Sequence, residues 1–393
     1  MSTDNSRAPT DESKPPKQEN DRSKFPRTIV DPDGDLCLVV GDKKGSAFVV
    51  CSKTVARASP VWKKLLYGEF AESLQPSKDS GEEWTVRLPD DNPGSMKVLL
   101  NIIHSRFDQV PIKVDMSNIC TIDGEQITFS DLFLLTVLTD KYDLTRNLRP
   151  WATTWLEDVR AATTHNLKFS MTSMDHLCWI AWELGDEGSF TTAIKHIVLD
   201  FVKIEDKIRK DPYFPELFSL GYEPAYTLSL VDGYRKETIK NMLDLVKGAV
   251  EKLLQRDRGG AQLFCTQGLR KTKTNPNLEG TINCETTMLG AIIQSLHASQ
   301  LWPIPNSKKV QISVSALADK LRCLDSQSRL PNHPCRALPN IATALDTILD
   351  KAIPPLPEAY ISHLKAQAEK TGIICQDLGL VTQTLALTIQ EVS

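Results

Sequence analysis

The chain has 393 residues, of which 41% are hydrophobic and 24% are charged. These proportions exclude a largely disordered or fibrous chain, and the length predicts two folded domains, or one domain with a helical extension. The formal net charge of -4 at pH 7 gives no overall attraction to nucleic-acid phosphates or anionic lipids. We therefore expect neither a nucleic acid nor a membrane as the partner.

The cysteines and the N-terminal residues bear on the cellular compartment. Nine cysteines are scattered over the whole length without the spacing of a disulfide framework. Residues 1–27 contain no apolar stretch of the kind found in secretory signals, and no apolar run of membrane-spanning length follows. These features predict reduced thiols and an intracellular protein, in the nucleus or the cytoplasm.

The first elements in chain order are a tail and a hairpin. Residues 1–28 alternate in charge and contain little apolar surface, so we expect a disordered tail. The β-rich runs 35–41 and 47–51 flank a short polar turn and predict a β-hairpin. A third strand is expected over 84–88, where apolar and polar residues alternate.

Helices are predicted between and after these strands. A short helix is expected from Ser52, and a second one begins after Ser59, which is a suitable N-cap, with Pro60 at its first position. Trp62, Leu65, Leu66 and Phe70 then repeat at helical spacing, although Gly68 favours an end there. A third helix is expected over 96–107, followed by a loop with a short strand near 110–114. A fourth helix is expected to begin at a capping box formed by Thr128 and Asp131. A fifth helix is expected from about 148 to 159.

Beyond residue 160 strand signals almost vanish, and helical periodicity recurs between Gly- and Pro-containing breaks. The clearest amphipathic pattern runs from Ile239 to Leu253. A polar, basic stretch near 266–280 predicts an exposed loop. Other helices are expected around 177–184, 190–201, 288–296, 314–321 and 361–364. The sequence thus predicts an α+β domain over 29–158 and an all-α region over 159–393.

Several local strings in the first domain resemble BTB/POZ domains of the filamentous-fungal type. They are Asp31-Pro-Asp-Gly-Asp35, Ser59-Pro-Val-Trp62, Leu138-Thr-Asp-Lys-Tyr-Asp-Leu144 and Leu148-Arg-Pro-Trp151. The order strand, strand, helix pair, strand and three helices is also the one expected of such a domain. The resemblance implies a small sheet capped by helices that serves as a protein-protein interaction module, a scaffold or adaptor, and not an enzyme. It covers about a third of the chain.

Two departures from the better-studied animal BTB families concern the partner. The basic His-Lys or His-Arg step that opens the first helix in those families is Ser52-Lys53 here. The hydrophobic-x-Glu signature of cullin-binding members is not evident in Ser105–Pro111. The resemblance leaves open self-association as a homodimer, an unknown protein partner, a transcription or chromatin regulator, and a substrate adaptor of a cullin-RING ubiquitin ligase.

Candidate chemical sites are few, and each has a structural alternative. Tetrahedral zinc would need thiolate and imidazole ligands, for which the candidates are Cys265, Cys284, His333 and Cys335, but no pair has the close spacing of consecutive ligands. Asp175, His176 and Cys178 lie near one another, yet the histidine and the cysteine point to different faces of a helix. We therefore predict no catalytic residue, no metal and no cofactor.

Two further groups of residues have a structural and a functional interpretation. Trp62, Trp151 and Trp155 sit at helical spacing with aliphatic residues, which favours core packing over a base-stacking surface. Arg270, Lys271 and Lys273 fit a localisation signal or a nucleic-acid patch less well than a solvated loop. We expect core residues in the first case and exposed surface in the second.

Overall fold

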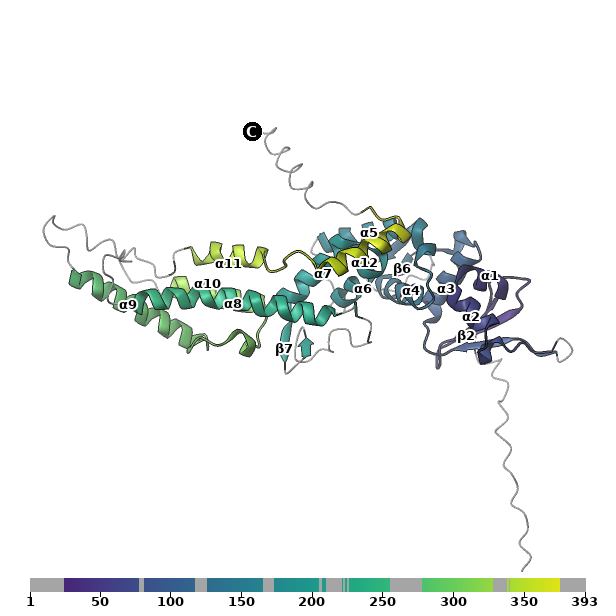
Figure 1. Cartoon of the computed structure of the whole chain (residues 1–393), viewed down its shortest axis with the longest axis horizontal. Coiled ribbons are helices and arrows are strands. Elements are labelled where there is room, and N and C mark those ends of the chain that lie inside the picture. The colour runs from purple at the N-terminus through teal and green to yellow at the C-terminus, as the bar shows by residue number, and fades with distance from the viewer. Residues whose placement is uncertain are drawn as a thin grey trace, which may run out of the picture. The chain divides into compact units, whose positions relative to one another are not determined.

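The computed structural model describes residues 25–77, 81–116, 126–164, 173–204, 207–209, 221, 223–224, 226–254, 278–327, 338 and 340–374. It is a mixed α/β structure, with a small sheet in the N-terminal part and many helices after it (Figure 1). The chain divides into two compact units, Met1–Val110 and Pro111–Ser393, which we call the N-terminal unit and the C-terminal unit.

The N-terminal unit contains a four-stranded sheet. Its strands are β1 (Arg27–Ile29), β2 (Leu36–Val40), β3 (Ser46–Val50) and β4 (Thr85–Leu88), in the spatial order β1-β3-β2-β4. The hairpin predicted from the sequence is the antiparallel pair β2 and β3, in which Leu38 faces Phe48. β1 and β4 add to its two edges in parallel. The Leu38–Phe48 pair and the neighbouring Cys37–Val49 pair point to opposite faces and are both buried, so both faces of the hairpin are covered.

Helices cover this sheet. They are α1 (Ser52–Ala58), α2 (Pro60–Tyr67) and α3 (Pro93–Ile103), with the short 3-10 helices η2 (Ala71–Ser73) and η3 (Phe107–Gln109). Ser59 caps α2 as predicted, because its hydroxyl accepts a hydrogen bond of 3.0 Å from the Trp62 N–H. The Trp62 side chain is completely buried.

The first half of the C-terminal unit begins with two short parallel strands, β5 (Lys113–Asp115) and β6 (Gln126–Thr128). The helices α4 (Phe129–Lys141), η4 (Thr145–Leu148), α5 (Arg149–Thr164), α6 (Ser173–Leu184) and α7 (Glu187–Asp200) follow. Thr128 caps α4, since its hydroxyl accepts a hydrogen bond of 3.1 Å from the Asp131 N–H and donates one of 2.8 Å to the Asp131 carboxylate. α6 packs against both α4 and α7.

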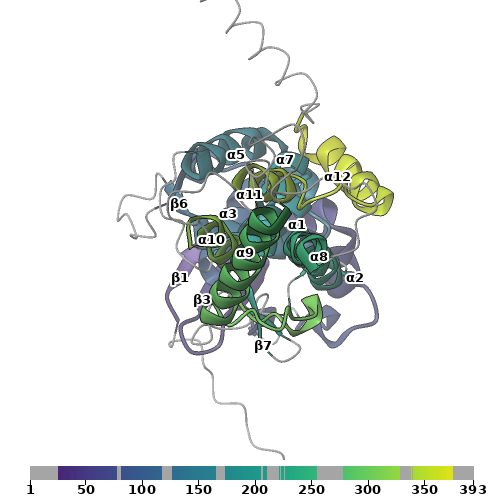
Figure 2. The same ribbon diagram turned by 90° about the vertical axis from the view of Figure 1, so that its left-hand side faces the viewer.

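The second half contains the long helix α8 (Thr227–Leu254), α9 (Leu278–Ala298), η6 (Ser307–Lys309), α10 (Val314–Gln327), α11 (Ile341–Asp350) and α12 (Glu358–Thr371). α8, α9, α10 and α11 share a hydrophobic core that includes Met242, Val246, Ile292, Leu317 and Leu345. Figure 2 shows α8 and α10 on either side of α9, with α11 beside them. The amphipathic pattern of Ile239–Leu253 is therefore part of α8, and its apolar stripe faces this core.

The structure differs from the sequence-based expectations in where the chain divides. The compact units meet at Val110, whereas a boundary near residue 158 was expected. The reason is that α4 packs on α6 and α5 packs on α12, so both helices belong to the C-terminal unit. The expected tail, 1–28, is too long, because Arg27 and Thr28 pair with β3. Residues 1–24 lie outside the described residues.

The expectation of an all-α region after residue 159 is also corrected. β7 (Val202–Ile204) and β8 (Lys207–Arg209) form a small antiparallel pair there. Strands of three residues are too short to show an alternating pattern in the sequence. Most of the expected loop at 266–280 lies outside the described residues, and its last three residues belong to α9. No helix in the described part of the chain combines the length and the apolar character needed to cross a membrane.

Candidate interaction surface

The most exposed apolar feature of the N-terminal unit follows α2. Tyr67, Phe70 and Leu74 expose 44%, 55% and 76% of their surface, respectively, and we call these three residues the apolar ridge. In the sequence, Phe70 continues the helical spacing of Trp62 and Leu66. The helix nevertheless ends at Tyr67, as Gly68 predicted, and the Gly68 N–H donates to the Lys64 carbonyl. The chain then turns out of the helix and leaves Phe70 in solvent.

Trp84 supports this ridge from the sheet side. Its indole lies edge-on to the Tyr67 ring, with the ring centroids 6.0 Å apart. The Trp84 Nε1–H also donates a hydrogen bond of 2.9 Å to the carbonyl of Glu72 in η2. Because Trp84 is itself buried, the backbone between Phe70 and Leu74 is tied to the core while its apolar side chains remain exposed.

Ser52, at the start of α1, connects Tyr67 to Asp35. The Ser52 backbone N–H and hydroxyl each donate to the Asp35 carboxylate at 2.7 Å. The Tyr67 hydroxyl lies 2.6 Å from the Ser52 hydroxyl, and it is the donor because the Ser52 proton is already directed at Asp35. Position 52 thus holds a neutral hydroxyl, and Asp35 receives neutral donors there. The arrangement also places the start of α1 beside the end of α2.

His104 fixes the other side of the α1 N-terminus. Its Nδ1 lies 2.9 Å from the Leu100 carbonyl, and its Nε2 accepts the Cys51 backbone N–H at 3.2 Å. A ring that donates from Nδ1 and accepts at Nε2 is a neutral imidazole. Burial lowers the pKa of His104, which favours this neutral form.

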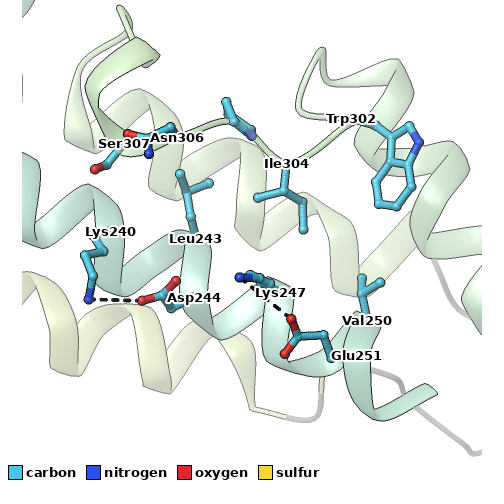
Figure 3. A pocket seen from close by; sticks show the side chains of 11 residues that line it. Lys240, Leu243, Asp244, Lys247, Val250, Glu251, Trp302, Ile304, Asn306 and Ser307 are labelled. Carbon is cyan, nitrogen blue, oxygen red and sulfur yellow. Dashed lines mark ion pairs between the residues drawn. The ribbon is translucent and has the colours of Figure 1, made fainter. Parts of the chain in front are cut away.

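The C-terminal unit contains a cavity of about 510 Å³ between α8 and the segment Trp302–Ser307 (Figure 3). Leu243, Val250 and Ile304 give it apolar walls, and the Trp302 indole is 37% exposed beside them. The charged lining residues pair with each other along α8: Lys240 lies 3.2 Å from Asp244, and Lys247 lies 3.7 Å from Glu251. Because these charges neutralise one another, the cavity suits an apolar group better than an ion.

Of the four candidate zinc ligands, only Cys284 lies among the described residues. It is buried on α9 in the core shared with α8 and α10. Cys265, His333 and Cys335 lie outside the described residues. In the ranges that the structure describes, no three His, Cys, Asp or Glu side chains form a group that could hold a metal ion.

The structure does not bring His176 and Cys178 together as a catalytic pair. The His176 ring stacks on Phe133 at a centroid distance of 4.0 Å, and burial lowers its pKa. Cys178 is fully buried, and burial raises the pKa of its thiol well above the usual value, so the reactive thiolate is suppressed. Cys178 therefore lies in the interior of the helical region, whereas His176 is partly exposed.

Two of the three tryptophans are core residues, as the sequence predicted, because Trp62 and Trp155 are completely buried. Trp151 is only partly buried, and its ring stacks on Trp155 with the ring centroids 6.3 Å apart. The Trp155 Nε1–H donates a hydrogen bond of 3.0 Å to the Pro111 carbonyl. Arg270, Lys271 and Lys273 lie outside the described residues.

Among the buried titratable groups that sequence reasoning missed is Glu183, which is 1% exposed on α6. Thr145 of η4 donates to one of its carboxylate oxygens, and the Gln367 Nε2–H of α12 donates to the other at 2.7 Å. Burial raises its pKa from 4.5 to about 8, and the nearby Asp140 acts in the same direction. A lone acidic residue in the apolar run Leu177–Leu184 is the signal that could have identified it.

Comparison of the chain with family models, curated proteins and solved structures found no match.

Proposed function

We propose that the chain is an intracellular, non-catalytic scaffold or adaptor of the BTB/POZ type, whose N-terminal unit binds another protein or a second copy of the chain. The observation that carries this proposal is the apolar ridge of Tyr67, Phe70 and Leu74, three large apolar side chains exposed within eight residues. Isolated exposed apolar residues are common, whereas a cluster of them is typical of an interaction surface. The hairpin followed by the α1–α2 pair also agrees with the resemblance.

The rigidity of the ridge supports the same proposal. Tyr67 is held by Ser52 and Trp84, and the backbone of Glu72 is held by Trp84. A surface whose backbone is already ordered loses less conformational entropy when a partner binds. Aromatic side chains are also the ones that most often dominate the binding energy of protein interfaces.

The test is quantitative capture of partners from the native cell by the tagged full chain. We expect the double variant Phe70→Asp/Leu74→Asp to lose partners that the wild type retains, because it places charge in an apolar contact. Phe107→Asp is the matched control, since Phe107 is 57% exposed in the same unit but lies outside the ridge. A second copy with a different tag, expressed in the same cells, reports self-association.

Both Phe70→Asp/Leu74→Asp and Phe107→Asp must retain the fold. Hydrogen exchange in β2 and β3 that is as slow as in the wild type shows that they do. Identical sets of captured proteins for the wild type and the double variant would rule out the ridge as the interaction surface. If neither a second copy nor any other protein is retained above the level of an unrelated tagged chain, the proposed function is wrong.

A further inference from the structure

The helix pair α1 and α2 carries an exposed basic surface next to the apolar ridge. From Ser52 to Gly68 the sequence contains four basic residues and no acidic one. Lys53, Arg57, Lys63 and Lys64 are all exposed. None of the four forms an ion pair with another described residue. We call these four side chains the basic surface.

The basic surface and the apolar ridge are adjacent. Lys63 and Lys64 precede Tyr67 by four and three residues in α2, so the three side chains lie on one helix face. The hydrogen bond between Tyr67 and Ser52 places the start of α1, and with it Lys53, beside the end of α2. Tyr67 therefore lies where the basic surface meets the ridge.

The remaining charges on the ridge limit what can bind. Glu69 and Glu72 stand before and after Phe70 and lie between Tyr67 and Leu74. A nucleic acid or an anionic membrane that covered both parts would bring its phosphates against these carboxylates. The ridge also ends in the aliphatic Leu74, which offers no ring on which a base can stack. A short segment with few negative charges avoids this conflict, because its charged part contacts only the helices.

We propose that this combined surface binds a peptide segment of another protein in which acidic residues stand next to large apolar residues. This inference rests on the proposed interaction function and names the chemistry of the partner. The acidic part of the segment faces Lys53, Lys63 and Lys64, and its apolar part covers Tyr67, Phe70 and Leu74. The charges speed the encounter and select the partner, and the apolar contacts supply most of the affinity.

The experiment is selection from a random-peptide phage library on the purified full chain, followed by binding measurements with the enriched peptides. We expect enrichment of peptides that combine Asp or Glu with Phe, Trp or Leu. Lys63→Glu/Lys64→Glu should weaken the binding of such a peptide about tenfold, and this loss should shrink as salt is added. Phe70→Ser/Leu74→Ser should weaken it by a similar factor without changing its salt dependence.

Lys43→Glu/Lys44→Glu is the matched control. It changes the same number of charges at two adjacent exposed lysines of the same unit, in the turn between β2 and β3. This variant should bind the selected peptides within about twofold of the wild type. A fold defect caused by charge reversal in general would appear in both variants, and hydrogen exchange of β2 and β3 separates it from a binding defect.

Several results would overturn the inference. They are failure to enrich any peptide, enriched peptides without an acidic excess, and binding that Lys63→Glu/Lys64→Glu leaves unchanged. Vesicles of phosphatidylserine and phosphatidylcholine and a single-stranded DNA serve as parallel probes. Binding of either that requires Lys63 and Lys64, without peptide binding, would replace the peptide by a polyanion. Cellular partners that depend on Phe70 and Leu74 but not on Lys63 and Lys64 would retain the proposed function and remove only this inference.

Discussion

Replacing Glu183 with glutamine tests the hydrogen-bond network that joins α6 to η4 and α12. Folding raises the pKa of this carboxyl from 4.5 to about 8, so the native state binds its proton more tightly than the unfolded chain does. The stability that this proton provides is fully present below pH 4.5 and is lost as the pH rises through about 8. Each pKa unit corresponds to about 1.4 kcal/mol, so the wild type should lose about 3 kcal/mol between pH 4.5 and pH 7.

Glu183→Gln removes the stability loss that ionisation of Glu183 causes, and it preserves hydrogen bonds to Thr145 and Gln367. The amide oxygen accepts from Gln367 as the carboxylate does, and the amide N–H donates to the hydroxyl of Thr145. We expect the variant to be more stable than the wild type at neutral pH, by about 3 kcal/mol, and equally stable near pH 4.5. The difference between the two proteins should therefore appear as the pH rises.

The stability difference between the wild type and Glu183→Gln is measured by hydrogen exchange of peptides from α6 and α12 in the C-terminal unit. The exchange rates are recorded from mildly acidic to mildly alkaline pH and corrected for the intrinsic exchange rate. Peptides from β2 and β3 in the N-terminal unit provide the internal reference. Glu369→Gln, an exposed change on α12, is the control for loss of a negative charge. The reasoning is refuted if the wild type and Glu183→Gln show the same pH dependence in α6.

Two further predictions concern other parts of the fold. Because burial lowers the pKa of His104, its stabilising effect is present above its ordinary value of 6.5 and is lost as the pH falls toward its lower native value. Exchange at α1 should accordingly accelerate in acid more in the wild type than in His104→Gln, and a parallel acceleration would contradict the neutral-imidazole assignment. Gly185→Ala should destabilise the C-terminal unit by about 2 kcal/mol or more, because Gly185 has φ +83° and an added Cβ would lie 2.2 Å from the Ala368 nitrogen of α12. Gly248→Ala, where an added Cβ meets nothing, should instead stabilise α8 by about 0.5–1 kcal/mol, and urea unfolding of both variants checks the opposite signs.

The elements of the N-terminal unit that the sequence predicted are those with local signals. β2 and β3 show as two apolar runs, and α2 begins with a capping serine followed by proline. β1 was missed because Arg27–Ile29 has no pattern of its own and is a strand only through its pairing with β3, twenty residues further along the chain. In the C-terminal unit, the sequence analysis missed α11, although its residues Ile341, Leu345 and Ile348 share one helix face.

The apolar ridge was not predicted from the sequence. The helix pair and its end at Gly68 were expected, but the helical spacing of Phe70 did not show that the residue is exposed after the helix ends. Glu183 illustrates a different limit. Its partners Thr145 and Gln367 lie 38 and 184 residues away in the sequence, and nothing near Glu183 indicates that they meet. The local sequence pattern indicates which residues become buried. Which polar groups form hydrogen bonds with a buried residue depends on the tertiary fold, which the local pattern does not show.

The attachment of α12 has a consequence for folding during synthesis. The side chain of Thr371 donates to the carbonyl of Leu184, and Gln367 completes the environment of Glu183. When α6 leaves the ribosome, α12 has not yet been made, so Glu183 remains hydrated and ionised until α12 has emerged as well. The N-terminal unit draws its sheet and helices from residues up to Val110 and can fold much earlier. A surface on that unit is therefore complete while the C-terminal unit still lacks α12.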